Sequence, residues 1–122
     1  MVVEAVPSAA VLAVAVDHVR LSYLYLDGGD LDGYGSLLHA DAQFRRPDAA
    51  DARGRAEVLE MLAARRVVGA HELFKVVADG DCVAAVGRHA GVDGVGVEFA
   101  DFFTIGDDGL ILGCRRFYYL SP

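Results

Sequence analysis

The sequence has no tryptophan, no asparagine, only two cysteines and a single lysine, Lys75. No Cys-x-x-Cys pair and no Cys/His ligand spacing is present, so a metal site is not expected. Cys82 and Cys114 are expected to be buried, free thiols of a reducing cytoplasm. Acidic residues outnumber lysine and arginine by 18 to 11, for a net charge of −7. Nucleic acid and anionic membranes are therefore not expected as partners, because both require a basic face.

Long apolar runs are also scarce. The stretch 9–16 is apolar, but Glu4 stands where a signal peptide would carry basic residues. No run reaches the roughly 18 residues of a membrane-spanning helix. Glycine patterns that bind nucleotides are missing as well, so no cofactor is expected. These absences together predict a cytoplasmic protein that does not associate with membranes.

Apolar residues make up 54% of the 122 residues. This length suits one domain, 1–122, with one core. So much apolar sequence in a small domain indicates an internal pocket, or a face that a second copy covers.

The first part of the chain has helical periodicity. Ser8 is placed to cap a helix over 9–27, and Gly28-Gly29 is placed to end it. Asp30 is placed to cap a second helix, from Leu31 to about Leu38. The first helix carries one apolar stripe, formed by Leu12, Val16, Val19, Tyr23 and Leu26.

The rest of the chain is dominated by strand patterns. A strand over 41–46 ends at Pro47, a polar loop covers 48–54, and a third helix is expected over 55–66. Helices followed by strands predict an α+β fold, with N-terminal helices on a strongly bent antiparallel sheet that encloses a pocket. Turns at 79–81, 91–96 and 106–109 join four further strands into an antiparallel meander, at 71–78, 82–90, 97–105 and 110–120.

Several local patterns carry a resemblance to a known family. They are YLYLDGGDLD at 23–32, LLHADAQFRRP at 37–47, RGR at 53–55, VADGD at 77–81 and FADFFTIGDDG at 99–109. Their order and spacing resemble the NTF2-like superfamily, which includes ketosteroid isomerase, limonene-epoxide hydrolase, scytalone dehydratase and the SnoaL-like polyketide cyclases. The resemblance implies a cone, in which a bent sheet surrounds a pocket under a lid of helices. It also implies a homodimer through the sheet. Because the superfamily includes enzymes and binding modules, the site must be argued separately.

Compared with the ketosteroid isomerase pattern, Asp101 falls where that enzyme keeps a protonated aspartic acid that donates to an oxyanion. Phe99 and Phe103 share its strand face, and aromatic walls disfavour an ionised carboxyl. Asp101 is therefore a candidate general acid or hydrogen-bond donor. The alternatives are an aspartate paired with an arginine and an aspartate at a solvated strand position.

Arg46 stands where the isomerase has its proton-abstracting aspartate. A guanidinium stays charged and cannot act as a base, so the usual ketosteroid isomerase activity is not expected. Arg46 could hold a substrate carboxylate or enolate, pair with Asp101, or face solvent at a strand end. Limonene-epoxide hydrolase uses an Asp-Arg-Asp cluster, so an arginine in such a pocket is compatible with catalysis.

The oxyanion tyrosine of the isomerase aligns with Ser22, one residue before Tyr23. One residue along a helix rotates a side chain by about 100°. Tyr23 therefore takes that role through a shifted helix, or it packs in the core.

A histidine is the remaining candidate base, because its ordinary pKa is near ~6.5. His89 faces the pocket if the odd-numbered residues of 82–90 point inward, and Arg88 faces it if the even-numbered ones do. Both faces are apolar, so the alternation leaves this open. His71 begins a strand, and His18 borders the stripe of the first helix.

On the last strand, the resemblance turns three side chains inward and three outward. The outward aromatic residues suit a dimer face, which Glu98 and Phe102 would share. The inward set is Cys114, Arg116 and Tyr118, and the outward set is Arg115, Phe117 and Tyr119.

The sequence thus predicts an acid–base enzyme that isomerises, cyclises, dehydrates or opens an epoxide on a small, apolar, oxygenated molecule of natural-product biosynthesis. The alternative is a non-catalytic binding or dimeric assembly module of the same fold. The predicted catalytic residues are Asp101, His89 and Arg46. The predicted substrate-binding residues are Tyr23, His18, Phe44, His71, Phe99, Phe103, Arg116 and Tyr118.

Overall fold

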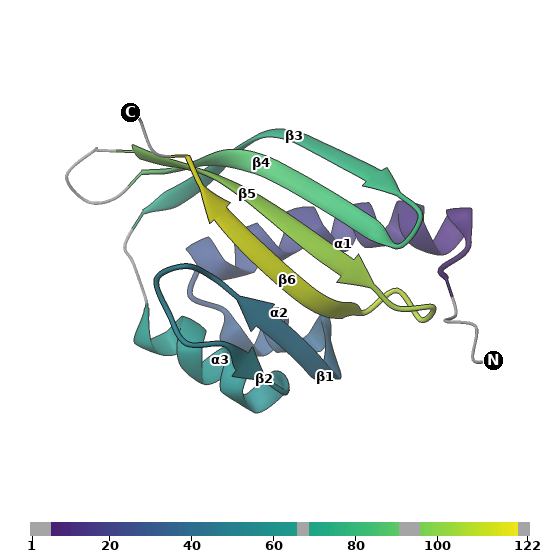
Figure 1. Cartoon of the computed structure of the whole chain (residues 1–122), viewed down its shortest axis with the longest axis horizontal. Helices are drawn as coiled ribbons and strands as arrows, with labels where there is room; N and C mark the ends of the chain where they lie inside the picture. Colours follow the sequence, from purple (N-terminus) through teal and green to yellow (C-terminus); the bar gives the residue numbers. More distant parts are fainter. Residues whose placement is uncertain (1–5, 66–68, 91–95, 120–122) are drawn as a thin grey trace.

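A six-stranded, strongly curled sheet positions the rest of the chain (Figure 1). The computed structural model describes residues 6–65, 69–90 and 96–119. The strand order is β2-β1-β6-β5-β4-β3, in which β3 to β6 form the predicted antiparallel meander and β1 joins β6 in parallel. The strands are β1 (Leu38–Arg45), β2 (Ala52–Arg53), β3 (Ala70–Asp79), β4 (Cys82–Ala90), β5 (Gly96–Ile105) and β6 (Ile111–Tyr118).

Three helices cover one face of this sheet: α1 (Ala9–Asp27), α2 (Leu31–Ser36) and α3 (Arg55–Ala64). Helix α1 runs along the inner side of β3, β4 and β5, while α3 packs on β1 and β2 (Figure 1). The predicted α+β arrangement is confirmed. The core between helices and sheet includes the fully buried Val19, Leu38, Val58, Val83 and Ile111.

The ends of the first two helices follow the predicted capping chemistry. Ser8 Oγ accepts a hydrogen bond from the Val11 amide at 3.2 Å, which satisfies a free donor of the first turn of α1. Gly28 ends α1, and Asp30 Oδ1 accepts from the Gly33 amide at 2.8 Å. Both caps are confirmed.

The boundaries around α2 and β1 differ from the prediction. Helix α2 ends at Ser36, and Leu38 already belongs to β1, where it pairs with Ile111 of β6. Apolar residues in succession fit a helix or a buried strand equally well, and the deciding partner is distant in sequence. The short strand β2 lies in the predicted loop 48–54. Predictions on residues 66, 91–95 and 120 lie outside the described residues.

The structure settles which face of β4 points inward. Val83, Ala85 and Gly87 are buried, so His89 shares the inner face. Arg88 points outward, where it lies 3.9 Å from a carboxylate oxygen of Glu72.

Helix α1 is, by length and composition, long and apolar enough to cross a membrane. Such a segment was not predicted from the sequence. The core helix of a soluble protein passes the same test, and the predicted stripe of α1 does pack on the sheet: Val19 and Tyr23 are buried, and Leu12, Val16 and Leu26 contact the core.

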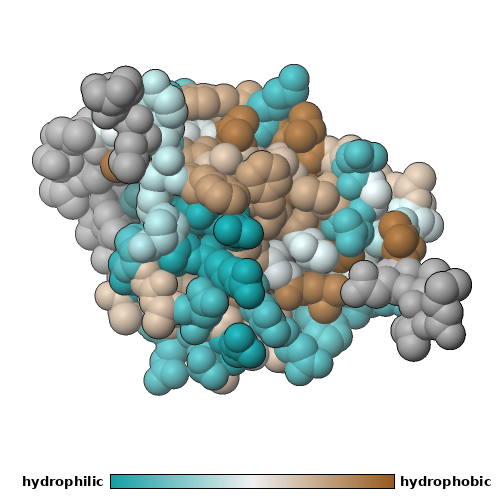
Figure 2. Space-filling model, viewed as in Figure 1, coloured by the Kyte–Doolittle hydropathy of each residue, from teal (hydrophilic) through white to brown (hydrophobic). Residues whose placement is uncertain are grey.

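The outer face of the sheet carries several exposed apolar side chains. Figure 2 shows apolar surface gathered over the outer strands, beside a hydrophilic patch near β1. The outward direction predicted for Phe102, Phe117 and Tyr119 is confirmed by their exposure. The other large apolar side chains exposed on this face of β3 and β4 are Phe74, Val77 and Val86.

Candidate functional site

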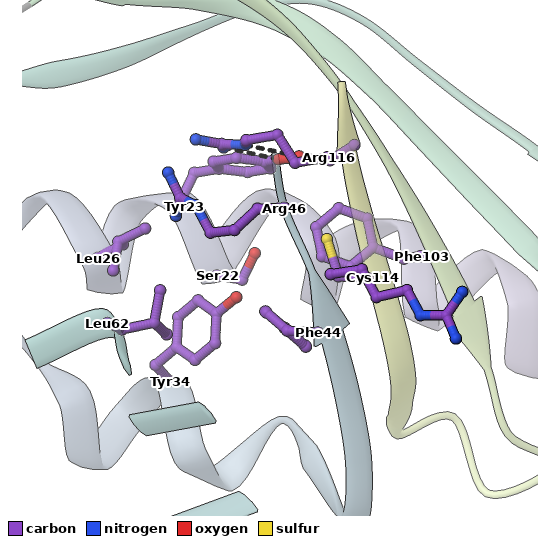
Figure 3. Close-up of a pocket in the computed structure, with 12 residues that line it drawn as sticks. Ser22, Tyr23, Leu26, Tyr34, Phe44, Arg46, Leu62, Phe103, Cys114 and Arg116 are labelled. Carbon is purple, nitrogen blue, oxygen red and sulfur yellow. Dashed lines mark hydrogen bonds and ion pairs between the residues drawn. The ribbon is translucent and has the colours of Figure 1, made fainter. Parts of the chain in front are cut away.

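The polar centre of the molecule is Asp101, on β5, which is only 2% exposed. The Tyr23 hydroxyl donates a hydrogen bond of 2.5 Å to its Oδ2. Arg116 donates from Nε to Oδ1 and from Nη2 to Oδ2, both at 2.8 Å (Figure 3). Because Asp101 accepts all three hydrogen bonds, from Tyr23 and from Arg116, it acts as an acceptor, as a carboxylate does.

The neighbours of Asp101 are themselves held in one protonation state. Burial, reinforced by the charge of Asp101, raises the pKa of Tyr23 well above its ordinary value, so its hydroxyl keeps its proton. Burial alone would lower the pKa of Arg116, but the hydrogen bond and the charge of Asp101 outweigh it and raise that pKa. The Arg116 guanidinium also lies 4.4 Å above the centre of the Phe99 ring.

This geometry does not fit the expected role of Asp101 as a protonated donor. The aromatic walls are present, since Phe99 and Phe103 are buried beside it. However, Arg116 is its partner on the neighbouring strand and supplies the counter-charge. The arginine-paired alternative, which the sequence left open, is the one observed. A catalytic role for Asp101 stays a prediction.

Tyr23 packs in the core, as one of its two alternatives predicted, and its role as an oxyanion donor stays a prediction. It is 5% exposed, and its ring packs 5.8 Å from Phe99 and 6.1 Å from Phe103. Its hydroxyl nevertheless reaches Asp101. Ser22, one residue earlier, is also buried, and its hydroxyl donates to the Val19 carbonyl at 2.6 Å.

A small cavity lies beneath this ion pair. Its volume is about 40 Å³, which is room for about one water molecule and far less than a drug-sized ligand needs. The predicted enclosure is therefore largely filled by side chains. Figure 3 shows the side chains around it, from α1, α2, α3, β1, β5 and β6. Among the predicted site residues, those that line it are Tyr23, Phe44, Arg46, Asp101, Phe103 and Arg116.

Tyr34, on α2, is a cavity residue that the sequence analysis missed. It is 4% exposed, and burial raises the pKa of its phenol. Among the described residues, no hydrogen bond joins its hydroxyl to a protein group, and Figure 3 shows that hydroxyl pointing into the cavity. In the sequence, nothing distinguishes it from an ordinary core tyrosine of a short helix.

Cys114, on β6, also lines the cavity. Both cysteines are free and partly buried. Burial raises the pKa of the Cys114 thiol well above its ordinary value, so the thiol stays protonated and is a poor nucleophile. The inward direction predicted for Cys114, Arg116 and Tyr118 agrees with their contacts.

Arg46 does not pair with Asp101, and its role in holding a substrate anion stays a prediction. Its Nε donates to Asp48 Oδ1 at 2.6 Å, and its Nη2 donates to the Tyr118 hydroxyl at 2.6 Å. Burial would lower the pKa of Arg46, but the hydrogen bond with Asp48 raises it overall, and the same bond lowers the pKa of Asp48. The Arg46 side chain is 16% exposed, so the solvent-facing alternative does not apply either.

A second polar cluster lies on the other side of Tyr23. Asp27, the last residue of α1, accepts the backbone N–H of His71 at 2.9 Å and lies 2.5 Å from His71 Nδ1. The His71 ring stacks on His89 at 4.2 Å and lies 5.2 Å from the Tyr23 ring. A carboxylate accepts only, so Nδ1 carries the proton and Nε2 keeps its lone pair. Asp27 was not predicted as a site residue, because it directly precedes Gly28-Gly29 and resembles an ordinary residue at the end of a helix.

Both histidines of this cluster are disfavoured in their charged form. Burial lowers the pKa of His71, although Asp27 opposes this effect. Burial also lowers the pKa of His89, and His71 adds to that shift. Both rings are therefore neutral at pH 7. His18 is not part of either cluster: it does not line the cavity, and its buried Nδ1 has no partner among the described residues.

Within the described ranges, no group of three or more His, Cys, Asp or Glu side chains is arranged to hold a metal ion. The buried ionic centre is instead a carboxylate held by guanidinium and phenol. It offers hydrogen-bond donors, a fixed negative charge and, next to it, a neutral imidazole.

Solved structures with this fold cover most of the chain. A structure described as a proposed ketosteroid isomerase, from Kribbella flavida, superposes with a TM-score of 0.79 at 19% identity. The match covers 88% of this chain and 79% of that one. A proposed polyketide cyclase from Sinorhizobium meliloti gives 0.74 at 22% identity, covering 83% and 94%. An epoxide hydrolase of the limonene-epoxide hydrolase type from M. tuberculosis gives 0.75 at 22%, covering 86% and 82%.

At these identities the likeness establishes the fold alone. No curated protein sequence matches this chain. The SnoaL-like domain family, however, matches residues 19–113, a range that includes Tyr23, Asp27, Arg46, His71 and Asp101. The predicted superfamily is confirmed, and the chain belongs to the SnoaL-like family of the NTF2-like fold.

Proposed function

We propose that this chain is a cofactor-independent acid–base enzyme acting on a small, apolar, oxygenated molecule. One observation supports this most: the Tyr23 ring lies between two carboxylate-anchored groups, Asp101–Arg116 and Asp27–His71. Such sites place a proton acceptor and oxygen-binding donors around one reacting centre. The relatives described as isomerase, cyclase and epoxide hydrolase belong to reaction types that need both.

His71 is the proposed base. It does not line the small cavity, so a substrate must also open a path beside the Tyr23 ring to reach it. It is neutral at pH 7, and Asp27 fixes the tautomer in which Nε2 is free to accept a proton. Asp27 acts as a positioning residue, because it orients the ring and stabilises the imidazolium that forms on proton transfer. His89, the base predicted from the sequence, stacks on His71. A positive charge on one of these two rings disfavours a positive charge on the other.

Tyr34 and Arg116 are the proposed groups that hold the substrate oxygen. The Tyr34 hydroxyl faces the cavity and has no hydrogen-bond partner among the described residues, so it can donate to a carbonyl or epoxide oxygen. The volume of about 40 Å³ admits only the oxygen end of a molecule unless side chains move. We therefore expect a substrate to displace Arg46 from the cavity rim, where Asp48 and Tyr118 hold it.

A defined probe tests the base without knowledge of the natural substrate. A base removes the C3 proton of 5-nitrobenzisoxazole, and the released electron pair breaks the N–O bond to give a coloured cyanophenolate. We expect the protein to accelerate this opening by about 100-fold over an equal concentration of imidazole. His71→Ala should abolish the acceleration, and Asp27→Asn should weaken it.

A matched control is available in His39, which lies 3.9 Å from Asp41 on the exposed part of β1. His39→Ala removes an imidazole beside a carboxylate but leaves the proposed site intact. Equal rates for His71→Ala and the wild type, with both folded by circular dichroism, would refute His71 as the base.

A second candidate is a non-catalytic binding module. It is favoured by the bidentate pairing of Asp101 and by the small size of the cavity, since a filled interior leaves little room for turnover. In that case small ligands would still protect the fold against heat, but 5-nitrobenzisoxazole would open no faster than with free imidazole.

We also propose that the chain forms a homodimer through the outer face of the sheet and works in the cytoplasm. The exposed Phe102 and Phe117 pack edge to face at 5.8 Å on that face and give it a rigid aromatic centre. Free thiols at Cys82 and Cys114 suit a reducing compartment.

A further inference from the structure

An open cleft lies outside the filled cavity, where β1 leaves the sheet beside β6. Its volume is about 520 Å³. Among the described residues it is lined by Arg45, Arg46, Arg115 and Arg116, with Asp51 as the one acidic residue. In Figure 2 hydrophilic surface gathers in this region, next to the apolar outer face. Four arginines line this one cleft in a chain whose net charge is −7.

The parallel pairing of β1 and β6 creates this cluster. Arg45 is the register partner of Arg115, so the dipeptides 45–46 and 115–116 lie side by side. Like charges on facing strand positions repel one another. The arrangement therefore costs stability unless negative groups lie between the guanidiniums.

The carboxylates of the chain satisfy only part of this charge. Arg116 is held by Asp101 and Arg46 by Asp48, so these two are already neutralised. Arg45 lies 3.6 Å from Asp51, and both side chains are about half exposed, so this pair contributes little.

Arg115 has no carboxylate partner among the described residues. Its guanidinium lies instead over the Phe117 ring, 5.1 Å from the centre. Phe117 and Tyr118 together give the cleft an aromatic wall directly beside the two arginines.

We propose that this cleft binds an aromatic carboxylate. Arg45 and Arg115 donate hydrogen bonds to the carboxylate, and Phe117 packs on the aromatic ring. A guanidinium presents two parallel donors that match the two oxygens of a carboxylate. The wall at Phe117 favours a flat, apolar ring over a hydrated inorganic ion. The acidic remainder of the surface repels anions, so the cleft is the favoured place for one. This site does not depend on acid–base chemistry at His71. It competes with the proposed dimer for the Phe117 ring, so light scattering of the same samples is needed to separate ligand binding from dimer formation.

Calorimetric titration with 2-naphthoate at low salt tests the site. We expect 2-naphthoate to bind about tenfold or more tightly than the neutral, equally shaped 2-naphthamide, since only the carboxylate forms charge-assisted hydrogen bonds with both guanidiniums. Arg45→Gln and Arg115→Gln should each weaken naphthoate by about tenfold. Both side chains are exposed, so both variants are expected to keep the melting temperature of the wild type.

Arg20→Gln is the matched control, because Arg20 is an exposed arginine of α1 far along the chain from the cleft. It changes the net charge equally and should leave naphthoate binding unchanged. Equal affinity for 2-naphthamide, unchanged binding in both cleft variants, or equal weakening by Arg20→Gln would each overturn the proposal. Displacement by inorganic phosphate at naphthoate's own affinity would overturn the aromatic part.

Discussion

Asp101 on β5 and Arg116 on β6 form a bidentate ion pair in the interior of the protein, and both donor–acceptor distances are 2.8 Å. Asp101→Asn removes the charge that balances Arg116. A buried guanidinium left without its partner costs about 3–5 kcal/mol, so we expect a loss of that size in the free energy of unfolding. Urea denaturation of the two proteins measures it.

The exposed pair Arg45–Asp51 provides the comparison for that prediction. Asp51→Asn makes the same chemical change at an ion pair whose side chains are about half exposed. It should cost under about 1 kcal/mol. A loss for Asp101→Asn no larger than the loss for Asp51→Asn would show that the buried pair contributes no more than a surface one.

The pKa of His71 is a direct test of the second cluster. Burial lowers it below the ordinary histidine value, while the charge and hydrogen bond of Asp27 raise it. Asp27→Asn removes only the opposing effect, so the pKa of His71 should fall further. A proton NMR titration of the imidazole C–H signals measures both values.

His39 serves as the internal reference in the same spectra, because it is partly exposed and lies 3.9 Å from Asp41. Its signals should be unaffected by Asp27→Asn. A rise in the pKa of His71 in that variant would contradict the geometry of the Asp27 contact.

The sequence predicted the fold more fully than it predicted the site. Helix α1 was placed from its stripe and from its caps at Ser8 and Gly28, all of which are local signals. Strand β4 was placed at its observed bounds, but its inward face was undecided until Val83 and Ala85 proved buried. Where two faces of a strand are equally apolar, only the packing of distant elements decides between them.

The partners of the site residues were the part that local patterns could not supply. Asp101 was chosen correctly as a buried group, but its pairing with Arg116 depends on the β5–β6 register. Asp27 and His71 are 44 residues apart in the chain, so their contact required the three-dimensional packing of α1 on β3. Arg46 pairs with the carboxylate of Asp48, two residues away, on a loop whose path could not be predicted from the sequence.

Stability should decrease in two separate steps as the pH is lowered. The pKa of His71 is lowered in the folded state, so below about pH 6.5 the unfolded chain takes up a proton that the folded protein does not. Unfolding is thereby favoured in the window between the unfolded and folded pKa values. His89, whose pKa is also lowered, acts with the same sign.

The second step lies at lower pH and involves Asp48. Its pKa is lowered in the folded state by the hydrogen bond from Arg46, so its contribution is complete above about pH 4 and is lost as the pH falls through the folded pKa. Urea midpoints measured from pH 3 to 8 should show both steps. His71→Phe should flatten the first step only, whereas an unchanged curve would mean that His71 titrates alike in both states.

The apolar outer face gives the last prediction. Phe102 and Phe117 are both more than two-fifths exposed, at 43% and 45%, and they pack on each other. A cluster of this kind on a small acidic domain is expected to be covered by a second copy. Phe117→Asp places a charge at its centre and should convert a dimer to a monomer in light scattering. Leu24→Asp makes the same change at a residue of α1 that is 68% exposed, and it should leave the dimer intact. If the wild-type protein is monomeric at micromolar concentration, the proposed interface is wrong. The proposed chemistry around Tyr23 would not be affected, because the groups described there all come from one chain.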